Sequence, residues 1–353
     1  MMQDVAEIRV GGELLSRVVS GPESAGVAGL LEDYRKVWLV YDGNASAHAA
    51  KVRAALEKSG KLAAACPLNV SEENKTIGTV LSLEDWLLAT GADRDALLLA
   101  VGGGITTDMA GFAASVYKRG IRFAFVPTTL LAQVDAAIGG KTGVNFHSLK
   151  NMLGVIRQPD FTYICPDVLE TLPARDFRSG AAEMLKTFII EDGGNYEKAV
   201  RVLSEIAAGA SIASRRDELQ RLISAAAAVK AGVVSRDQFE SGERRKLNLG
   251  HTFAHAIEWK AREAGSDITH GEAVAIGIIQ AATLTDKALA ARLCEDFSKA
   301  GLPTELPFPL DSLADAMLKD KKAEDGKVHF VLIKSIGDVY TEDMTVAEAI
   351  ARL

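Results

Sequence analysis

The chain has 353 residues, of which 48% are hydrophobic and 25% charged. This length predicts two domains or one large one, and this composition excludes extensive intrinsic disorder. The formal net charge of −7 and the pI of about 5.5 disfavour nucleic-acid or membrane-surface binding, which needs a basic surface, but they leave room for a local basic pocket.

The first half of the chain alternates between strand-like and helix-like segments. Four short apolar runs rich in β-forming residues predict strands at 37–41, 96–101, 123–126 and 163–165. Continuous apolar runs of this length are typical of strands buried on both faces of a parallel sheet. Helical segments are predicted between them, at 47–59, 81–90 and 108–117. The alternation predicts a doubly wound α/β domain.

After about residue 172 the pattern becomes helical. Alanine-rich amphipathic segments predict helices at 180–190, 195–208, 219–234, 251–264 and 271–291, and one strand is predicted at 328–333. Pro173 interrupts local structure between the two patterns. We therefore expect an α/β domain over 1–172 and a mainly helical domain over 173–353.

Cysteine usage and the amino-terminal sequence bear on localisation. Three distant cysteines (Cys66, Cys165 and Cys294) and the lack of a CxxC pair argue against a disulfide framework or a thiolate zinc site. The amino-terminal segment lacks the basic start and apolar core of a signal peptide, and apolar stretches such as 273–279 are too short to span a bilayer. We expect a cytoplasmic protein with no nucleic-acid or membrane partner.

A glycine turn follows the second predicted strand. Gly102, Gly103 and Gly104 precede a helix expected to carry Asp108 in its first turn. Such a turn lets phosphate oxygens approach backbone N–H groups at a helix N-terminus, although a tight turn without a ligand explains it equally well. Thr128 and Thr129 follow the next strand in the same way, which favours a phosphate-bearing cofactor.

Three histidines fall within twenty residues. His251 and His255 are four apart and share a helix face, and His270 begins the next predicted helix. Glu183, three residues before Lys186 in an apolar helical stretch, is the candidate third ligand. Two imidazoles and one carboxylate suit Zn²⁺ with an open position for substrate. The alternatives are an ordinary histidine pair and an exposed Glu–Lys pair.

Isolated polar residues in glycine-rich or apolar surroundings form a third pattern. They lie in 134–145, at Lys150 and Asn151, at Lys230, and in 244–248. Each lysine alone could extend its amine to solvent. Together with a metal, they predict a pocket for a phosphorylated, carboxylated substrate.

These motifs strongly resemble the 3-dehydroquinate synthase family of the sugar-phosphate cyclase superfamily, over nearly the whole chain. The most specific stretches are 102–120, 127–145, 180–186, 230–237, 244–258 and 270–277, with Asp320-Lys321-Lys322 completing the set. The chain departs from the usual family pattern at Thr106–Thr107, Gly143 and Ala254, all packing or loop positions.

The resemblance implies a Rossmann-like, NAD-binding α/β domain followed by a helical metal- and substrate-binding domain. The implied reaction converts 3-deoxy-D-arabino-heptulosonate 7-phosphate to 3-dehydroquinate and phosphate, as part of the shikimate pathway. The implied cofactors are NAD⁺, which is not consumed, and a divalent metal, Zn²⁺ or alternatively Co²⁺. The implied metal ligands are Glu183, His251 and His270.

The resemblance also implies the remaining site residues. Those implied for NAD⁺ are Asp42, Asn44, Glu72, Lys75, Gly102, Gly103, Gly104, Asp108, Thr128, Thr129 and Lys150. Those implied for substrate and catalysis are Asp135, Lys141, Asn151, Lys186, Lys230, Arg244, Asn248, His255 and one of Lys321 or Lys322. His255 is expected to move the proton at C5, and Arg119 to reach the substrate phosphate of a neighbouring subunit, which implies a homodimer.

Three alternative functions stay open on the sequence. A related cyclase would act on sedoheptulose 7-phosphate or glucose 6-phosphate, but Lys230, Arg244 and Asn248 favour a carboxylated substrate. A metal-dependent polyol dehydrogenase shares the glycine turn but usually uses Asp as its first metal ligand. A catalytically inactive binding protein should have lost some of the metal and catalytic residues, and all are present.

Overall fold

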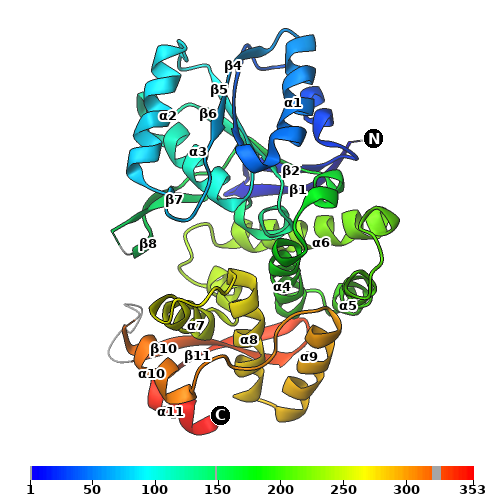
Figure 1. The fold of residues 1–353 in the computed structure, drawn as a ribbon, viewed down its shortest axis with the longest axis vertical. Helices are drawn as coiled ribbons and strands as arrows, with labels where there is room; N and C mark the ends of the chain where they lie inside the picture. The colour runs from blue at the N-terminus through cyan, green and yellow to red at the C-terminus, as the bar shows by residue number, and fades with distance from the viewer. Residues whose placement is uncertain (1, 148, 320–326) are drawn as a thin grey trace. The chain divides into compact units, whose positions relative to one another are not determined.

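The computed structural model describes residues 2–147, 149–319 and 327–353 (Figure 1). The chain divides into two compact units, which are described separately. The first contains Met1–Leu172 and Leu219–Phe239, and the second contains Pro173–Glu218 and Glu240–Leu353. Residues 219–239, which the sequence pattern places in the helical half, thus pack with the first unit.

The first unit is built on a seven-stranded sheet. Its strands are β1 (Gln3–Val10), β2 (Glu13–Ser20), β3 (Val37–Asp42), β4 (Leu62–Leu68), β5 (Leu97–Gly102), β6 (Arg122–Pro127) and β9 (Phe161–Ile164), in the order β1-β2-β9-β6-β5-β3-β4. The β1–β2 pair is antiparallel, and all other neighbouring pairs are parallel. The predicted Rossmann-like sheet is confirmed, and an amino-terminal hairpin that was not predicted extends its edge.

Helices cover both faces of this sheet (Figure 1). Alternate residues of β3 and β5, such as Trp38, Val40 and Leu98, form one core with α2 (Ile77–Ala89) and α3 (Gly104–Val116). Helix α1 (Ser46–Lys58) lies on the opposite side. All six residues of β5 are buried, as expected for a central strand between two helical layers. Most of α6 (Arg216–Arg236) also belongs to this unit.

A two-stranded antiparallel ribbon completes the first unit. It consists of β7 (Lys141–Phe146) and β8 (Leu149–Ile156), and β7 packs on α3.

The glycine turn joins a buried strand, β5, to a helix, α3, as predicted, but the helix starts earlier than expected. Helix α3 begins at Gly104 with Gly103 as its N-cap, so Asp108 lies beyond the first turn and not within it.

The second unit is mainly helical. Its helices are α4 (Ala174–Ile190), α5 (Gly193–Ala207), α7 (His251–Glu263), α8 (His270–Thr283), α9 (Lys287–Lys299), α10 (Leu310–Lys319) and α11 (Val346–Arg352), with a hairpin of β10 (Val328–Ser335) and β11 (Asp338–Met344). The single helix predicted over 271–291 is wrong. The Asp286 side chain accepts hydrogen bonds from the backbone of Ala288 and Leu289, and this cap starts α9 as a separate helix.

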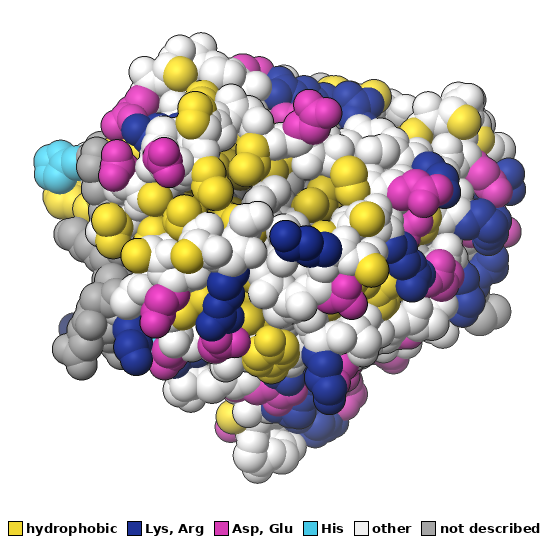
Figure 2. Space-filling model, turned by 90° about the horizontal axis from the view of Figure 1, so that it is seen from below, with side chains coloured by type: hydrophobic (Ala, Val, Ile, Leu, Met, Phe, Trp, Pro, Cys, Tyr) yellow, Lys and Arg dark blue, Asp and Glu magenta, His cyan; other side chains and the backbone are white. Residues whose placement is uncertain are grey.

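Helix α4 is the most buried element of the second unit, and it packs against α5 and α8. Ala181, Ala182, Met184 and Leu185 on it are fully buried. On the face drawn in Figure 2, basic and acidic side chains are interspersed, so that face has mixed charge. Among the described residues, no helix combines the length and apolar character needed to cross a membrane.

Candidate active site

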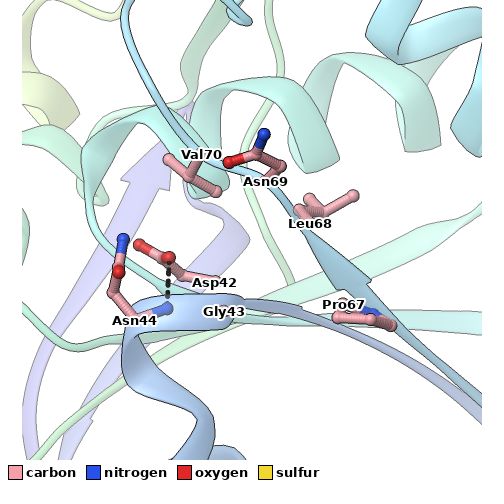
Figure 3. Close-up of a pocket in the computed structure, with 7 residues that line it drawn as sticks. All are labelled: Asp42, Gly43, Asn44, Pro67, Leu68, Asn69 and Val70. Carbon is pink, nitrogen blue, oxygen red and sulfur yellow. Dashed lines mark hydrogen bonds between the residues drawn. The ribbon is translucent and has the colours of Figure 1, made fainter.

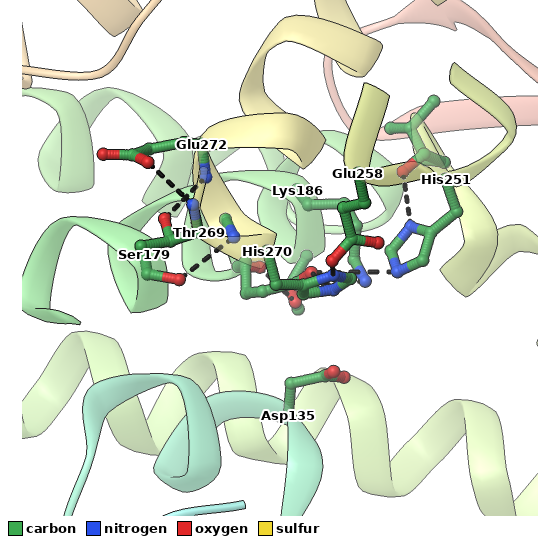
Figure 4. Close-up of polar contacts among 12 residues, drawn as sticks. Asp135, Ser179, Lys186, His251, Glu258, Thr269, His270 and Glu272 are labelled. Atoms are coloured by element: carbon green, nitrogen blue, oxygen red, sulfur yellow. Dashed lines mark hydrogen bonds and ion pairs between the residues drawn. The ribbon is translucent and has the colours of Figure 1, made fainter. Parts of the chain in front are cut away.

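A carboxylate and two imidazoles from three helices meet in the second unit. The two imidazoles are labelled in Figure 4. Glu183 lies on α4, His251 is the first residue of α7, and His270 is the first residue of α8. The Nε2 atoms of His270 and His251 lie 3.2 and 3.8 Å from Glu183 Oε1. One donor atom from each residue lies within 4.8 Å of the other two. The structure thus brings the three predicted metal ligands together.

Glu183 is the buried charge at the centre of this cluster. Its side chain has no exposed surface, and Lys186 Nζ lies 2.5 Å from Oε2, as expected for residues three apart on one helix face. Burial alone would raise the pKa of Glu183, but the charge of Lys186 and the contacts with His270 and His251 hold it well below its usual range. The carboxylate is therefore ionised at neutral pH.

The two imidazoles are oriented by their second nitrogen atoms. His251 Nδ1 lies 3.1 Å from the Leu249 carbonyl oxygen, so Nδ1–H donates and Nε2 keeps its lone pair. Burial, followed by the charge of Lys186, lowers the pKa of His251 well below its usual value, which keeps it neutral. Burial would also lower the pKa of His270, but Glu183 and Glu258 outweigh it and raise the pKa to about 10.

The donor set fits a divalent metal. Lys186 offsets the charge at Glu183 Oε2, but neither oxygen makes a hydrogen bond of good geometry, and the buried Oε1 faces the Nε2 atoms of both imidazoles, where a cation would satisfy it. The carboxylates of Glu183 and Glu258 flank the His270 ring and raise its pKa, so a divalent cation would compete with the proton there. One carboxylate and two imidazoles are the ligands of an open Zn²⁺ site.

Close helix packing places His270 beside Glu183. The N–H of Gly271 donates to Ser179 Oγ at 3.0 Å, and a Cβ on Gly271 would lie 2.0 Å from the Ser179 carbonyl oxygen. Glu272 forms a capping box with Thr269 and accepts from Arg175 at 2.8 and 2.9 Å. None of these contacts was predicted from the sequence, although the Thr-x-x-Glu spacing of a capping box was visible.

In the first unit, the glycine turn lies between β5 and α3. A Cβ on Gly102 would lie 2.4 Å from Thr106 Oγ1, and one on Gly103 would lie 3.0 Å from Thr129 Cγ2. The N–H of Thr128 donates to the Gly102 carbonyl at 2.9 Å. The glycine turn and the Thr128–Thr129 turn are therefore adjacent. Tight packing alone already requires a glycine at position 102.

A pocket of about 340 Å³ lies at the carboxyl ends of β3 and β4 (Figure 3). It is lined by Asp42, Gly43, Asn44 and the segment 67–70, and Asp42 Oδ1 accepts from the N–H of Asn44 at 2.9 Å. Ligands of open α/β sheets bind at this end of the strands. Asp42 and Asn44 were predicted here, whereas the contribution of 67–70 was not.

Three more predicted residues of the first unit are in contact. Lys75 Nζ lies 2.5 Å from Asp108 Oδ2 and also donates to the Asn151 side chain. Burial outweighs the attraction of Lys75 and raises the pKa of Asp108 to about 6. Glu72 Oε1 accepts from Asn145 Nδ2 at 2.8 Å, and Asn145 Oδ1 accepts from the N–H of Asn151 at 2.9 Å.

The other predicted residues divide between the units. In the first unit, Lys230 pairs with the Asp135 carboxylate and donates to its carbonyl at 2.7 Å. The side chains of the other three predicted residues there are exposed: Arg119, Lys141 and Lys150. In the second unit, Arg244 is buried, Asn248 donates to Glu240 at 2.6 Å, and the rings of His255 and His251 are 5.6 Å apart. Lys321 and Lys322 lie outside the described residues.

Comparison with known proteins identifies the family. Models described as 3-dehydroquinate synthase N-terminal and C-terminal match residues 65–179 and 180–323. The 3-dehydroquinate synthase of Cereibacter sphaeroides is 38% identical over 350 residues, covering 96% of this chain and 91% of the relative. The chain belongs to the 3-dehydroquinate synthase family. The predicted enzyme, a lyase acting on a phosphate ester, is thereby confirmed over the alternatives.

Two solved structures share the fold and identify the superfamily. One is 2-epi-5-epi-valiolone synthase of Streptomyces hygroscopicus with NAD⁺ and Zn²⁺ bound (29% identity, TM-score 0.84, 96% of both chains). The other is 2-deoxy-scyllo-inosose synthase with carbaglucose-6-phosphate, NAD⁺ and Co²⁺ (26% identity, TM-score 0.84, 100% of this chain and 99% of that chain). Their lower identities support 3-dehydroquinate synthase over these related cyclases.

Proposed function

We propose that this chain converts 3-deoxy-D-arabino-heptulosonate 7-phosphate to 3-dehydroquinate and phosphate, within the shikimate pathway of aromatic amino acid biosynthesis. The observation that carries the proposal is the cluster of Glu183, His251 and His270, because the resemblance to the family implies a divalent ion at the alcohol that is oxidised. NAD⁺ with Zn²⁺ or Co²⁺ in the two related structures supports the same cofactors here, with Zn²⁺ as the metal.

Side chains of the second unit hold the metal and move the proton. When bound, the metal ion supplies Lewis-acid polarisation of the C5 oxygen, and NAD⁺ supplies a reversible hydride acceptor. Glu183, His251 and His270 hold the ion, and Lys186 offsets the buried charge of Glu183 at 2.5 Å. His255, one turn after His251, accepts the C5 hydroxyl proton and later returns it.

Basic residues bind the two anionic ends of the substrate. Lys141, Asn151 and Arg119 contact the phosphate, Arg119 from a neighbouring subunit of a homodimer. Lys230 and Arg244 bind the carboxylate. Both are buried, which places each charge where little water competes with a ligand. Asn248 and one of Lys321 or Lys322 complete the substrate site, and Asp135 orients Lys230 through the ion pair between them.

The NAD⁺ site uses the residues at the carboxyl ends of the parallel strands. The pocket beside Asp42 and Asn44 receives one end of the dinucleotide, and the glycine turn before α3 receives its phosphates. The other predicted residues of this site are Glu72, Lys75, Asp108, Thr128, Thr129 and Lys150. We place the enzyme in the cytoplasm, since its cysteines are unpaired.

The test is a phosphate-release assay with three candidate substrates. The purified protein, supplied with NAD⁺ and Zn²⁺ or Co²⁺, should release phosphate from the heptulosonate phosphate with no net NADH absorbance at 340 nm. Glucose 6-phosphate and sedoheptulose 7-phosphate should give little or no turnover. Failure to turn over the heptulosonate phosphate under these conditions would refute the proposal, and net NADH formation would identify a dehydrogenase.

A further inference from the structure

We propose that Glu258 is a positioning residue for the metal ligand His270. Its carboxylate accepts the Nδ1–H of the His270 ring, so that Nε2 presents its lone pair to the ion. This inference rests on the metal centre proposed above and deepens it. Glu258 lies on α7, seven residues after His251, and seven residues complete two helical turns. Both side chains therefore project from the same face of α7.

The His270 ring lies between the carboxylates of Glu183 and Glu258, and Glu258 is seen beside it in Figure 4. Its Nδ1 is 3.5 Å from Glu258 Oε1, and its Nε2 is 3.2 Å from Glu183 Oε1. The Glu258 side chain is only 15% exposed, so little water competes for its oxygens. With a carboxylate beside each nitrogen, the plane of the ring is fixed, and the nitrogen nearer Glu183 is the one aimed at the metal position.

The start of α8 cannot by itself fix this ring. The capping box and the contact of Gly271 with Ser179 hold the backbone of His270 against α4. The imidazole can still rotate about the side-chain torsions of His270, and either ring nitrogen could carry the proton. An acceptor at Nδ1 removes both freedoms, because it selects one tautomer and one orientation.

The two histidine ligands differ in the partner of their second nitrogen. His251 Nδ1 faces the neutral carbonyl oxygen of Leu249, whereas His270 Nδ1 faces a carboxylate. A hydrogen bond to an ionised acceptor is roughly twice as strong as one between neutral groups. It also makes the ring a more basic ligand. Loss of Glu258 should therefore weaken metal binding and change the ligand field.

The test compares Zn²⁺ affinity and the Co²⁺ absorption spectrum of variants of the full chain. Glu258→Ala should weaken Zn²⁺ binding by roughly 10- to 100-fold, measured by competition with a chromophoric chelator, and should shift the Co²⁺ d–d bands. Glu258→Gln keeps an acceptor oxygen but not the charge, so its loss should be smaller, roughly three- to tenfold. Glu263→Gln, on the same helix and paired with Lys260 and Trp259, is the control and should match the wild type.

Wild-type affinity and an unshifted spectrum in Glu258→Ala would overturn the inference. If that variant does not fold, Glu258→Gln decides, and unchanged values for it have the same meaning. Glu183→Gln in the same titration separates this inference from the proposed function. If Glu183→Gln loses the metal while both Glu258 variants bind normally, the metal centre stands and only the role of Glu258 is wrong. If Glu183→Gln binds metal as the wild type does, the metal centre itself is wrong.

Discussion

Replacing Gly271 by alanine should damage the metal centre without changing any of its ligands. Gly271 is the second residue of α8 and follows the ligand His270. A Cβ at this position would lie 2.0 Å from the Ser179 carbonyl oxygen and 2.5 Å from its carbonyl carbon. Both of these atoms are backbone, so they cannot rotate away as the end of a flexible side chain can. Either α8 or α4 has to move.

The size of that movement follows from the packing. Real Cβ atoms essentially never approach other heavy atoms closer than 3.0 Å, so the two helices must separate by about 1 Å or more. Overpacking of this kind costs roughly 1–3 kcal/mol in the free energy of unfolding, which for a chain of 353 residues lowers Tm by roughly 1–4 °C. A shift of about 1 Å at a reacting centre costs roughly 100-fold in activity.

Three measurements on Gly271→Ala follow from this. Thermal unfolding should show the lower Tm, chelator competition should show weaker Zn²⁺ binding, and phosphate release should show the lower kcat/KM. The matched control is Gly194→Ala, at the second residue of α5 in the same unit. Its new Cβ would meet Asp192 Oδ1 at 3.7 Å, an ordinary contact, so stability should be unchanged or slightly higher.

Gly271→Ala with the Tm and Zn²⁺ affinity of the wild type would contradict the close packing of α8 on α4. An equal loss of stability in Gly194→Ala would contradict it too, because the effect would then belong to the helix position and not to the contact with Ser179.

Three further predictions concern the side chains of the metal site, of Asp108 and of the proposed subunit interface. Glu183→Gln should bind less than a tenth as much Zn²⁺ by elemental analysis and lose phosphate-release activity, and normal metal content would contradict the ligand assignment. The pKa of Asp108 is raised from 3.8 to about 6, so the folded chain binds this proton more tightly than the unfolded chain, and stability falls as pH rises through that window. The stability of Asp108→Asn should not fall in this way, so its urea midpoint relative to that of the wild type should rise between pH 4.5 and about pH 7.5. A difference between the two midpoints that does not change with pH would refute the raised pKa of Asp108. Mixing Arg119→Ala with His255→Ala subunits should restore part of the activity in mixed dimers, and no recovery in confirmed heterodimers would count against Arg119 acting across the interface.

Strongly patterned elements were predictable from the sequence, whereas weakly patterned ones were not. The strand predicted at 96–101 and the helices predicted at 47–59 and 251–264 appear within a residue or two as β5, α1 and α7. Strands β1 and β11 were missed because their residues mix charged and apolar types without a continuous apolar run. Sheet position and hairpin pairing stabilise them, and a local window of sequence carries little of either.

The candidate site was likewise predictable only in part from the sequence. The chemistry of Glu183, His251 and His270 was visible because acids and clustered histidines are expensive or unusual in apolar helices. Their mutual geometry was not visible, since Glu183 and His270 are far apart in sequence and meet through the packing of α4 and α8. Glu258 ends the stretch 244–258 that resembles the family, but the sequence assigned it no role, because only folding places its carboxylate beside His270.

The fold class and the kind of site were predictable from the amino-acid sequence. Apolar periodicity and turn residues act locally, and they were enough for a parallel-sheet domain, a helical domain, a glycine turn and a set of metal-ligand residue types. Which atoms meet depends on the tertiary structure. It places a carbonyl oxygen beside His251 Nδ1 and a carboxylate beside His270 Nδ1, and it leaves no room for a side chain at Gly271. It also associated residues 219–239 with the first unit. These are distances between residues remote in the chain, and long-range packing fixes them where local propensity cannot.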